Sequence, residues 1–108
     1  MNSDIPAISP IELKTRLDKK DNDYILLDVR GPQEHEICSL SDQLIPLHLL
    51  TTKFQELPKD KDIIIYCHHG SRSFMACQFL AAKGHKVYNL EGGIDLWSQQ
   101  VDPSCPRY

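Results

Sequence analysis

Short apolar runs alternate along the chain with segments of helical periodicity, which predicts an α/β protein. The runs Tyr24–Leu27 and Ile63–Ile65 are each bounded by polar residues, a pattern typical of strands buried on both faces. Further strands are expected over 86–90 and, more briefly, over 44–46. Because strands and helices alternate at short spacing, we expect a mainly parallel sheet covered by helices on both faces.

The first helix has a clear start signal. Ser9 is placed to cap it, Pro10 takes the first helical position, Glu12 reaches back to the cap, and the pattern fades by Lys20. Further helices are expected over 32–37, 49–57, 72–83 and 94–100. In the helix over 72–83 the expected buried positions are Phe74, Cys77, Phe79, Leu80 and Ala81.

Composition places the chain among ordinary globular domains. The 108 residues are 41% hydrophobic and 25% charged, which predicts one domain over 1–108, with a core at about 5–100 and a loose tail at 101–108. The net charge of -3 and the lack of a basic block exclude broad nucleic-acid or anionic-membrane binding. Met1–Asp4 lacks the features of an export signal, so a cytoplasmic location is expected.

The chain has four cysteines, at positions Cys38, Cys67, Cys77 and Cys105. In a reducing cytoplasm all four are expected to be free thiols. The preferred interpretation makes Cys77 a core residue and Cys105 an incidental residue of the tail. A resolving role for Cys38, near the segment from Asp28 to Glu34, stays open as the lesser alternative.

Cys67 has the strongest chemical signal. It ends an isoleucine-rich strand, where ligand sites lie in open parallel sheets, and a helix follows at about Ser71. Gly70 permits a tight loop, so that loop and helix amides can converge on the sulfur, with Arg72 nearby. A thiol in that field is expected to be largely thiolate and nucleophilic. The bland alternative is a buried structural cysteine.

Three motifs resemble signatures of the rhodanese family and occur in that family's order. They are Leu26–Arg30 followed by Glu34, the loop Cys67–Ser73, and Leu90–Trp97. The resemblance extends from about Ile5 to Tyr108 and implies a five-stranded, mostly parallel sheet with helices on both faces. It also implies a sulfurtransferase without cofactor or metal. A cysteine persulfide would carry sulfur from a donor such as thiosulfate to cyanide or a thiol, with a protein persulfide as another donor or acceptor.

The same resemblance assigns roles to individual residues. Cys67 would be the nucleophile, and Arg72 would hold the loop or stabilise negative charge on the donor. The loop residues expected to cradle the sulfur through their amides are His68, His69, Gly70, Ser71 and Ser73. The residues resembling the family's ion-pair scaffold, interpreted as structural support, are Asp28, Arg30 and Glu34.

Two other functions remain as alternatives. The loop from Cys67 to Arg72 has six residues, as in the family's sulfurtransferases, whereas related phosphatases and arsenate reductases have one more because a tetrahedral oxyanion needs a wider cradle. A non-catalytic protein-binding module is the other alternative, which the presence of Cys67 disfavours. Ser39 and Asp42 depart from the family pattern, where histidine and glycine are common, and we expect this to affect loop geometry and rate more than reaction class.

The side chains of His68 and His69 can be interpreted in two ways. Either ring is suited to supply protons or attract anions, but we favour two solvent-facing loop residues whose amides do the work. Because consecutive loop residues rarely converge on one ion, no metal is expected at Cys67, His68 and His69.

Overall fold

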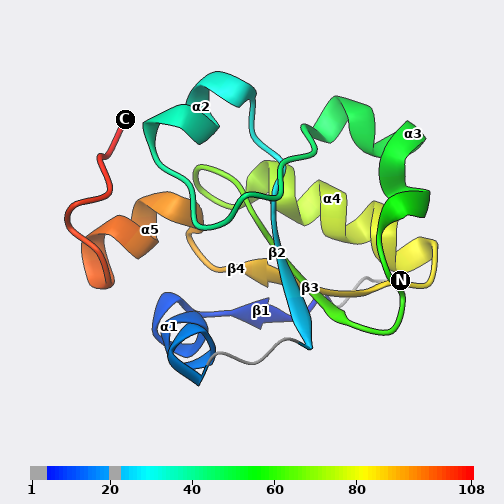
Figure 1. Cartoon of the computed structure of the whole chain (residues 1–108), viewed down its shortest axis with the longest axis horizontal. Helices are drawn as coiled ribbons and strands as arrows, with labels where there is room; N and C mark the ends of the chain where they lie inside the picture. The colour runs from blue at the N-terminus through cyan, green and yellow to red at the C-terminus, as the bar shows by residue number, and fades with distance from the viewer. Residues whose placement is uncertain (1–4, 20–22) are drawn as a thin grey trace.

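A parallel sheet with the strand order β1-β4-β3-β2 forms the centre of the protein (Figure 1). The computed structural model describes residues 5–19 and 23–108, and within these ranges the sheet has four strands. They are β1 (Ala7–Ile8), β2 (Tyr24–Asp28), β3 (Asp62–Tyr66) and β4 (Lys86–Leu90). Two expectations concern residues outside the described ranges. One is the lack of an export signal at Met1–Asp4, and the other is the end of the first helix at Lys20.

The isoleucine run occupies the sheet interior, as predicted. β3 pairs in parallel with β2 on one side and β4 on the other, and Ile63, Ile64 and Ile65 are fully buried. Successive side chains of a strand point to opposite faces. Ile63 and Ile65 therefore join one core cluster, and Ile64 and Tyr66 join the other.

The implied five-stranded sheet is corrected to four strands within the described residues. The expected strand over 44–46 is a single bridge between Asp28 and Leu44, continued by hydrogen bonds from Ile45 to Asp28 and from Leu47 to Val29. Pro46 lies between these two donors, at the position whose nitrogen faces away from β2, where an edge tolerates proline. The two-residue strand β1, by contrast, had no clear signal in the sequence.

Helices cover both faces of the sheet, as predicted (Figure 1). Their bounds are α1 (Pro10–Lys19), α2 (Pro32–Ile37), α3 (Leu50–Lys53), α4 (Ser71–Ala82) and α5 (Gly93–Gln100), with short 3-10 turns η1 (Leu47–Leu49) and η2 (Phe54–Glu56). Leu13 of α1 and Trp97 of α5 pack on one face, and Leu50 of α3 and Leu80 of α4 on the other. No helix among the described residues is long and apolar enough to cross a bilayer.

Some features of the helices were predicted correctly from local sequence signals, and others were not. The N–H of Glu12 donates to Ser9 Oγ and that of Ser9 to Glu12 Oε1, which confirms the capping box. The single helix expected over 49–57 is instead three short turns. In α4, Cys77 and Leu80 are buried as predicted, but Phe74 and Ala81 are exposed because α4 buries only the face carrying Ser73, Ala76, Cys77 and Leu80.

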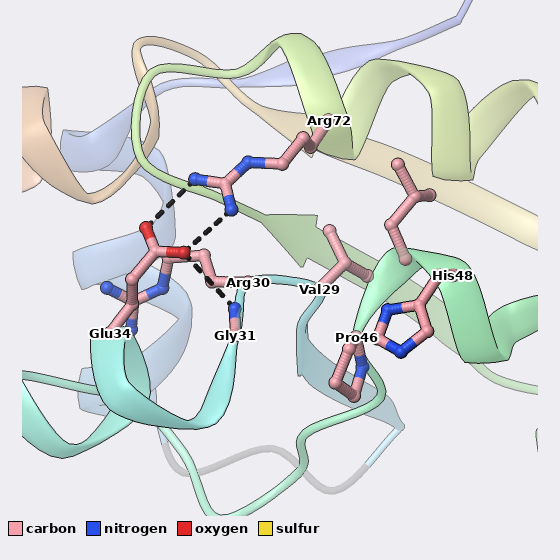
Figure 2. Close-up of a pocket in the computed structure, with 8 residues that line it drawn as sticks. Val29, Arg30, Gly31, Glu34, Pro46, His48 and Arg72 are labelled. Carbon is pink, nitrogen blue, oxygen red and sulfur yellow. Dashed lines mark hydrogen bonds and ion pairs between the residues drawn. The ribbon is translucent and has the colours of Figure 1, made fainter.

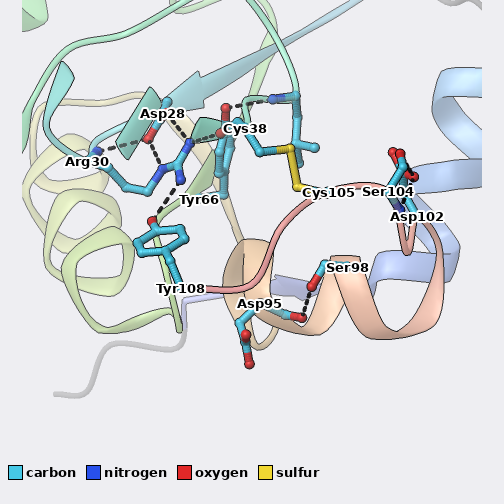
Figure 3. The surroundings of a disulfide bond; sticks show 11 residues. Asp28, Arg30, Cys38, Tyr66, Asp95, Ser98, Asp102, Ser104, Cys105 and Tyr108 are labelled. Carbon is cyan, nitrogen blue, oxygen red and sulfur yellow. Dashed lines mark hydrogen bonds and ion pairs between the residues drawn. A yellow bond between two sulfur atoms is a disulfide. The ribbon is translucent and has the colours of Figure 1, made fainter. Parts of the chain in front are cut away.

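The expectation of four reduced cysteines is wrong for two of them. Cys38, just after α2, forms a disulfide with Cys105 in the C-terminal tail, and their Cα atoms are 5.8 Å apart (Figure 3). Cys67 and Cys77 are free and buried. The tail is therefore not loose, and Cys105 is 2% exposed. The pairing was invisible to sequence reasoning because it joins residues 67 positions apart.

We predict that replacing both disulfide cysteines, Cys38→Ser with Cys105→Ser, lowers the free energy of unfolding by about 2–4 kcal/mol, because the unfolded chain regains the entropy of an open loop. Urea unfolding measures the change. Wild-type protein treated with dithiothreitol should move to the midpoint of the double variant, and the variant should not respond. Equal midpoints for oxidised wild type and variant would contradict the prediction.

Candidate active site

Cys67 directly follows β3, and its sulfur lies at the start of α4. The N–H of Gly70 donates to Cys67 Sγ at 3.1 Å and that of Ser73 at 3.3 Å. Gly70 caps α4 with a φ of 114°, a left-handed conformation that favours glycine. Amides of the first helical turn have no partner within the helix and carry its positive dipole end. The sulfur thus receives two donors that favour a negative charge there.

Burial alone would fit a structural cysteine, since Cys67 is 1% exposed. The two amides aimed at its sulfur are what distinguish this site. Among the loop residues expected to form the cradle, Gly70 and Ser73 donate to Sγ, whereas His69 and Ser71 are exposed. The amides of Gly70 and Ser73 are thus the expected cradle residues that the structure places within hydrogen-bond distance of Sγ.

Asn89 of β4 is a site residue that the sequence analysis missed. Its Nδ2 donates to the Gly70 carbonyl at 3.2 Å, and its Oδ1 accepts from Ser73 Oγ. Ser73 Oγ lies 3.3 Å from Cys67 Sγ and has one proton to give. With a thiol at Cys67, the S–H can donate to Ser73; with a thiolate, the hydroxyl can turn its proton to the sulfur. A polar residue in a buried strand beside β3 was the available signal.

Gly93 brings the backbone of α5 against the loop. The N–H of Ile94 donates to the Cys67 carbonyl at 2.9 Å and that of Asp95 to the His68 carbonyl at 3.0 Å. A Cβ on Gly93 would lie 2.4 Å from the His68 oxygen, closer than real contacts allow, and its φ is 63°. The sequence analysis included Gly93 only as part of the motif Leu90–Trp97, whereas the structure shows that this glycine permits the close approach.

Arg72 forms a two-pronged ion pair with Glu34 of α2 (Figure 2). Its Nη1 donates to Oε1 at 2.7 Å and its Nη2 to Oε2 at 2.9 Å. Chiefly through Arg72, and helped by Tyr108 and the Gly31 amide against the cost of burial, the pKa of Glu34 is lowered to about 2. Of the two roles expected for Arg72, this geometry matches the one that holds the loop.

A cavity of about 400 Å³ lies beside this ion pair. Val29, Pro46 and Leu47 give it an apolar wall, and His48 and Arg72 contribute polar groups (Figure 2). Cys67 is not among its lining residues. The cavity therefore adjoins the loop without reaching the sulfur.

Asp28 and Arg30 form a second, fully buried ion pair at the end of β2. Arg30 donates to Asp28 from Nε at 2.9 Å and from Nη2 at 2.8 Å, and His35 Nδ1 lies 2.8 Å from the same carboxylate. Burial works to lower the pKa of Arg30, but Asp28 and Tyr108 outweigh it and raise that pKa. The three residues assigned to the scaffold thus divide into two pairs, Asp28–Arg30 and Glu34–Arg72.

The two histidines differ in their surroundings. The ring of His68 stacks on Tyr108, with centroids 4.0 Å apart and planes 7° apart, so it does not simply face solvent. Burial, followed by the charge of His69, lowers the pKa of His68 and favours the neutral ring. His69 is exposed, and its Nε2 lies 3.7 Å from Asp95 Oδ2.

His68, His69 and Asp95 offer ligand atoms within 4.8 Å of one another. The two imidazole rings, however, are stacked with centroids 3.9 Å apart and planes tilted by 31°. Nitrogen lone pairs lie in the ring planes, so stacked rings direct them side by side instead of toward one ion. Asp95 also accepts hydrogen bonds from Arg107. We therefore assign no metal to this group.

We predict that Gly93→Ala displaces the active-site loop, since a Cβ cannot fit against the His68 carbonyl and the backbone is left-handed. The expected loss is about 2–3 kcal/mol of unfolding free energy, measured by urea denaturation. Gly84→Ala is the matched control, because Gly84 is also left-handed but meets only the Lys59 side chain. Equal losses of unfolding free energy in the two variants would show that the left-handed backbone alone causes the loss, and not the contact with the His68 carbonyl.

We predict that Glu34→Gln flattens the dependence of stability on acid pH. Folding lowers the pKa of Glu34 from 4.5 to about 2, so its contribution is complete above about pH 5 and is lost as the pH falls through 2. Wild type should lose about 2 kcal/mol more than the variant across this window. Urea unfolding at several pH values tests this, and parallel profiles would contradict it.

Comparison with known proteins identifies the family. The family model of the rhodanese-like domain matches residues 9–100. A sulfurtransferase of Allochromatium vinosum is 42% identical, covering 75% of this chain and 78% of that protein. The adenylyltransferase and sulfurtransferase MOCS3 of Drosophila virilis is 39% identical over 79% of this chain, which spans 21% of that protein. A rhodanese-related protein from Thermoplasma volcanium has a crystal structure with a TM-score of 0.81 at 32% identity, covering 89% of this chain and 93% of that one. With its parallel sheet and strand-end cysteine, the chain belongs to the rhodanese-like family, which includes sulfurtransferases among its relatives.

Proposed function

We propose that this chain is a sulfurtransferase in which Cys67 carries sulfur as a persulfide. The observation that supports this most directly is the pair of amides, from Gly70 and Ser73, that donate to Cys67 Sγ at the start of the 12-residue helix α4. Such donors stabilise a sulfur anion, which is the reactive form of a cysteine. The sulfurtransferase relatives supply the reaction class.

With thiosulfate as donor, the cycle balances without a cofactor. The Cys67 thiolate attacks the outer sulfur of thiosulfate, a new S–S bond forms, and sulfite leaves with the electron pair of the broken bond. Cyanide then attacks the outer sulfur of the persulfide, thiocyanate leaves, and the thiolate returns. A thiol acceptor takes the same sulfur and becomes a persulfide itself.

The loop residues divide this work. Gly70 and Ser73 hold the anionic sulfur through their amides, and the Ser73 hydroxyl lies within reach of Sγ at 3.3 Å. Arg72 fixes the end of the loop by its ion pair with Glu34, while Asp28 and Arg30 support the neighbouring end of β2. His68, His69 and Ser71 complete the loop's surface toward the substrate. We assign these roles as part of the proposal.

A protein persulfide is a second candidate partner besides a small donor. One relative joins an adenylyltransferase to a sulfurtransferase in a longer chain, which supports sulfur transfer within or between proteins. A cytoplasmic setting stays a prediction, and there the Cys38–Cys105 disulfide would face reducing thiol systems.

We predict that incubation with thiosulfate adds about 32 Da, one sulfur atom, to the intact protein, and that cyanide or dithiothreitol removes it. Cys67→Ser should abolish the gain. Cys77→Ser is the matched control and should retain it, because burial raises the pKa of Cys77 to about 12 and keeps that thiol protonated. Intact-protein mass spectrometry measures each result.

Thiosulfate, mercaptopyruvate and a cysteine-desulfurase donor should be tried in parallel. If none of them adds sulfur to the wild-type protein, persulfide chemistry is excluded and a binding module becomes the better explanation. Cys67-dependent turnover of an aryl phosphate or arsenate would instead favour phosphatase or reductase chemistry. Sulfur gain that survives Cys67→Ser would exclude Cys67 as the carrier.

A further inference from the structure

Tyr108, in the tail that follows α5, contacts the active-site loop and its supporting residues. Tyr108 Oη accepts a hydrogen bond from Arg30 Nη1 at 2.8 Å and donates one to Glu34 Oε2 at 2.7 Å (Figure 3 shows the first). Burial and Glu34 raise the pKa of Tyr108 to about 12, so the hydroxyl keeps the proton that it donates. Tyr108 thus lies between two charged side chains of the supporting scaffold, Arg30 and Glu34.

This hydroxyl joins the two ion pairs into one network. Arg30 binds Asp28 through Nε and Nη2, and Nη1 donates to Tyr108. Glu34 binds Arg72 with both carboxylate oxygens, one of which also accepts from Tyr108. Hydrogen bonds to charged groups are stronger than neutral ones. The network connects the buried end of β2 to Arg72 at the end of the loop.

The ring of Tyr108 contacts the other end of the loop. It stacks on His68, the residue after Cys67, with centroids 4.0 Å apart and planes 7° apart. Tyr108 therefore touches the loop directly at His68 and acts on Arg72 through Glu34. A displaced Tyr108 would remove the ring contact with His68 and one hydrogen bond to Glu34, the ion-pair partner of Arg72.

The segment after α5 has no regular secondary structure of its own, so Tyr108 needs other contacts to hold it in place. Here Cys105, three residues before Tyr108, is bonded to Cys38, and the Cys38 carbonyl itself accepts from Arg30. Between the two, Arg107 forms an ion pair with Asp95 of α5 at 2.9 Å. The tail runs beside α2 and α5 as a consequence (Figure 1). The disulfide limits the volume that Tyr108 can explore and keeps it near the loop.

We propose that Tyr108 is a positioning residue for sulfur transfer, and that the Cys38–Cys105 disulfide holds it in place. The inference rests on the proposed function, since it concerns the rate at which Cys67 exchanges sulfur. Tyr108 acts through Glu34, Arg72 and His68, without forming a bond to the transferred sulfur.

The hydroxyl is tested by Tyr108→Phe in the thiosulfate–cyanide assay, run without added thiols so that the disulfide stays intact. We expect kcat to fall about tenfold, with the KM for thiosulfate within about twofold of wild type, because the variant misplaces the loop without removing a donor-binding group. Tyr88→Phe, a hydroxyl loss elsewhere in the chain, is the matched control and should leave kcat unchanged. Wild-type kinetics in Tyr108→Phe would overturn the proposal.

A double-mutant cycle tests whether Tyr108 acts through Glu34. Glu34→Gln alone should lower kcat, and Tyr108→Phe in that background should add less than about twofold, because the link to Arg72 is already broken. A full tenfold loss on top of Glu34→Gln would mean that the two residues act independently, and would overturn the positioning route. Circular dichroism confirms that each variant is folded.

The tether is tested by Cys38→Ser with Cys105→Ser, assayed at a temperature where circular dichroism shows the variant folded. We expect the double cysteine variant to have the same kcat as Tyr108→Phe. Adding Tyr108→Phe to the double cysteine variant should lower kcat no further. Wild-type kcat in the folded cysteine variant would overturn the role of the disulfide. Should wild-type protein fail to gain sulfur at Cys67 from any donor, the proposed function fails; if wild type turns over and the Tyr108 variants match it, this inference alone fails.

Discussion

The approach of two backbone amides to one buried sulfur is the interaction on which the rest of the site depends. Cys67 follows the fully buried residues Ile63 to Tyr66 of β3, so its side chain starts from a fixed point at the end of the sheet. The chain must then turn sharply into α4, and Gly70 supplies the left-handed residue that this turn needs. The turn directs the amides of Gly70 and Ser73 at the sulfur before either can join the helix ladder.

Such a tight turn is held from three directions. The start of α5 donates to the carbonyls of Cys67 and His68, which is possible because Gly93 has no side chain. Asn89 fixes Gly70 and Ser73 from β4. Arg72 connects the far end of the loop to α2 through Glu34. Each support comes from a separate element, so the loop's shape is a property of the whole fold and not of its own sequence.

Because the loop is held by several separate elements, some of its features could be predicted from the sequence and others could not. Strong local signals were sufficient for the isoleucine strand, the capped start of α1 and the strand–loop–helix geometry around Cys67. The resemblance to the family pointed to Asp28, Arg30 and Glu34 as an ion-pair scaffold beside the loop. It did not indicate that they belong to two separate pairs, Asp28–Arg30 and Glu34–Arg72. The disulfide and Tyr108 depend on contacts between distant segments, for which neither periodicity nor composition has a signal, and Asn89 had only the weak signal of a polar residue within a strand. The expected strand over 44–46 is reduced to one bridge and two flanking hydrogen bonds along the edge of β2.

The two free cysteines show that position, and not burial, separates an inert thiol from a candidate nucleophile. Cys67 and Cys77 are 1% and 0% exposed, and both pack in the same core cluster. Cys77 lies inside α4, where the backbone amides are committed to the helix, and burial raises its pKa to about 12. Cys67 lies at the start of the same helix, where amides are still free to face it. The Gly70 and Ser73 amides offset part of the cost of burying a charged sulfur at this position.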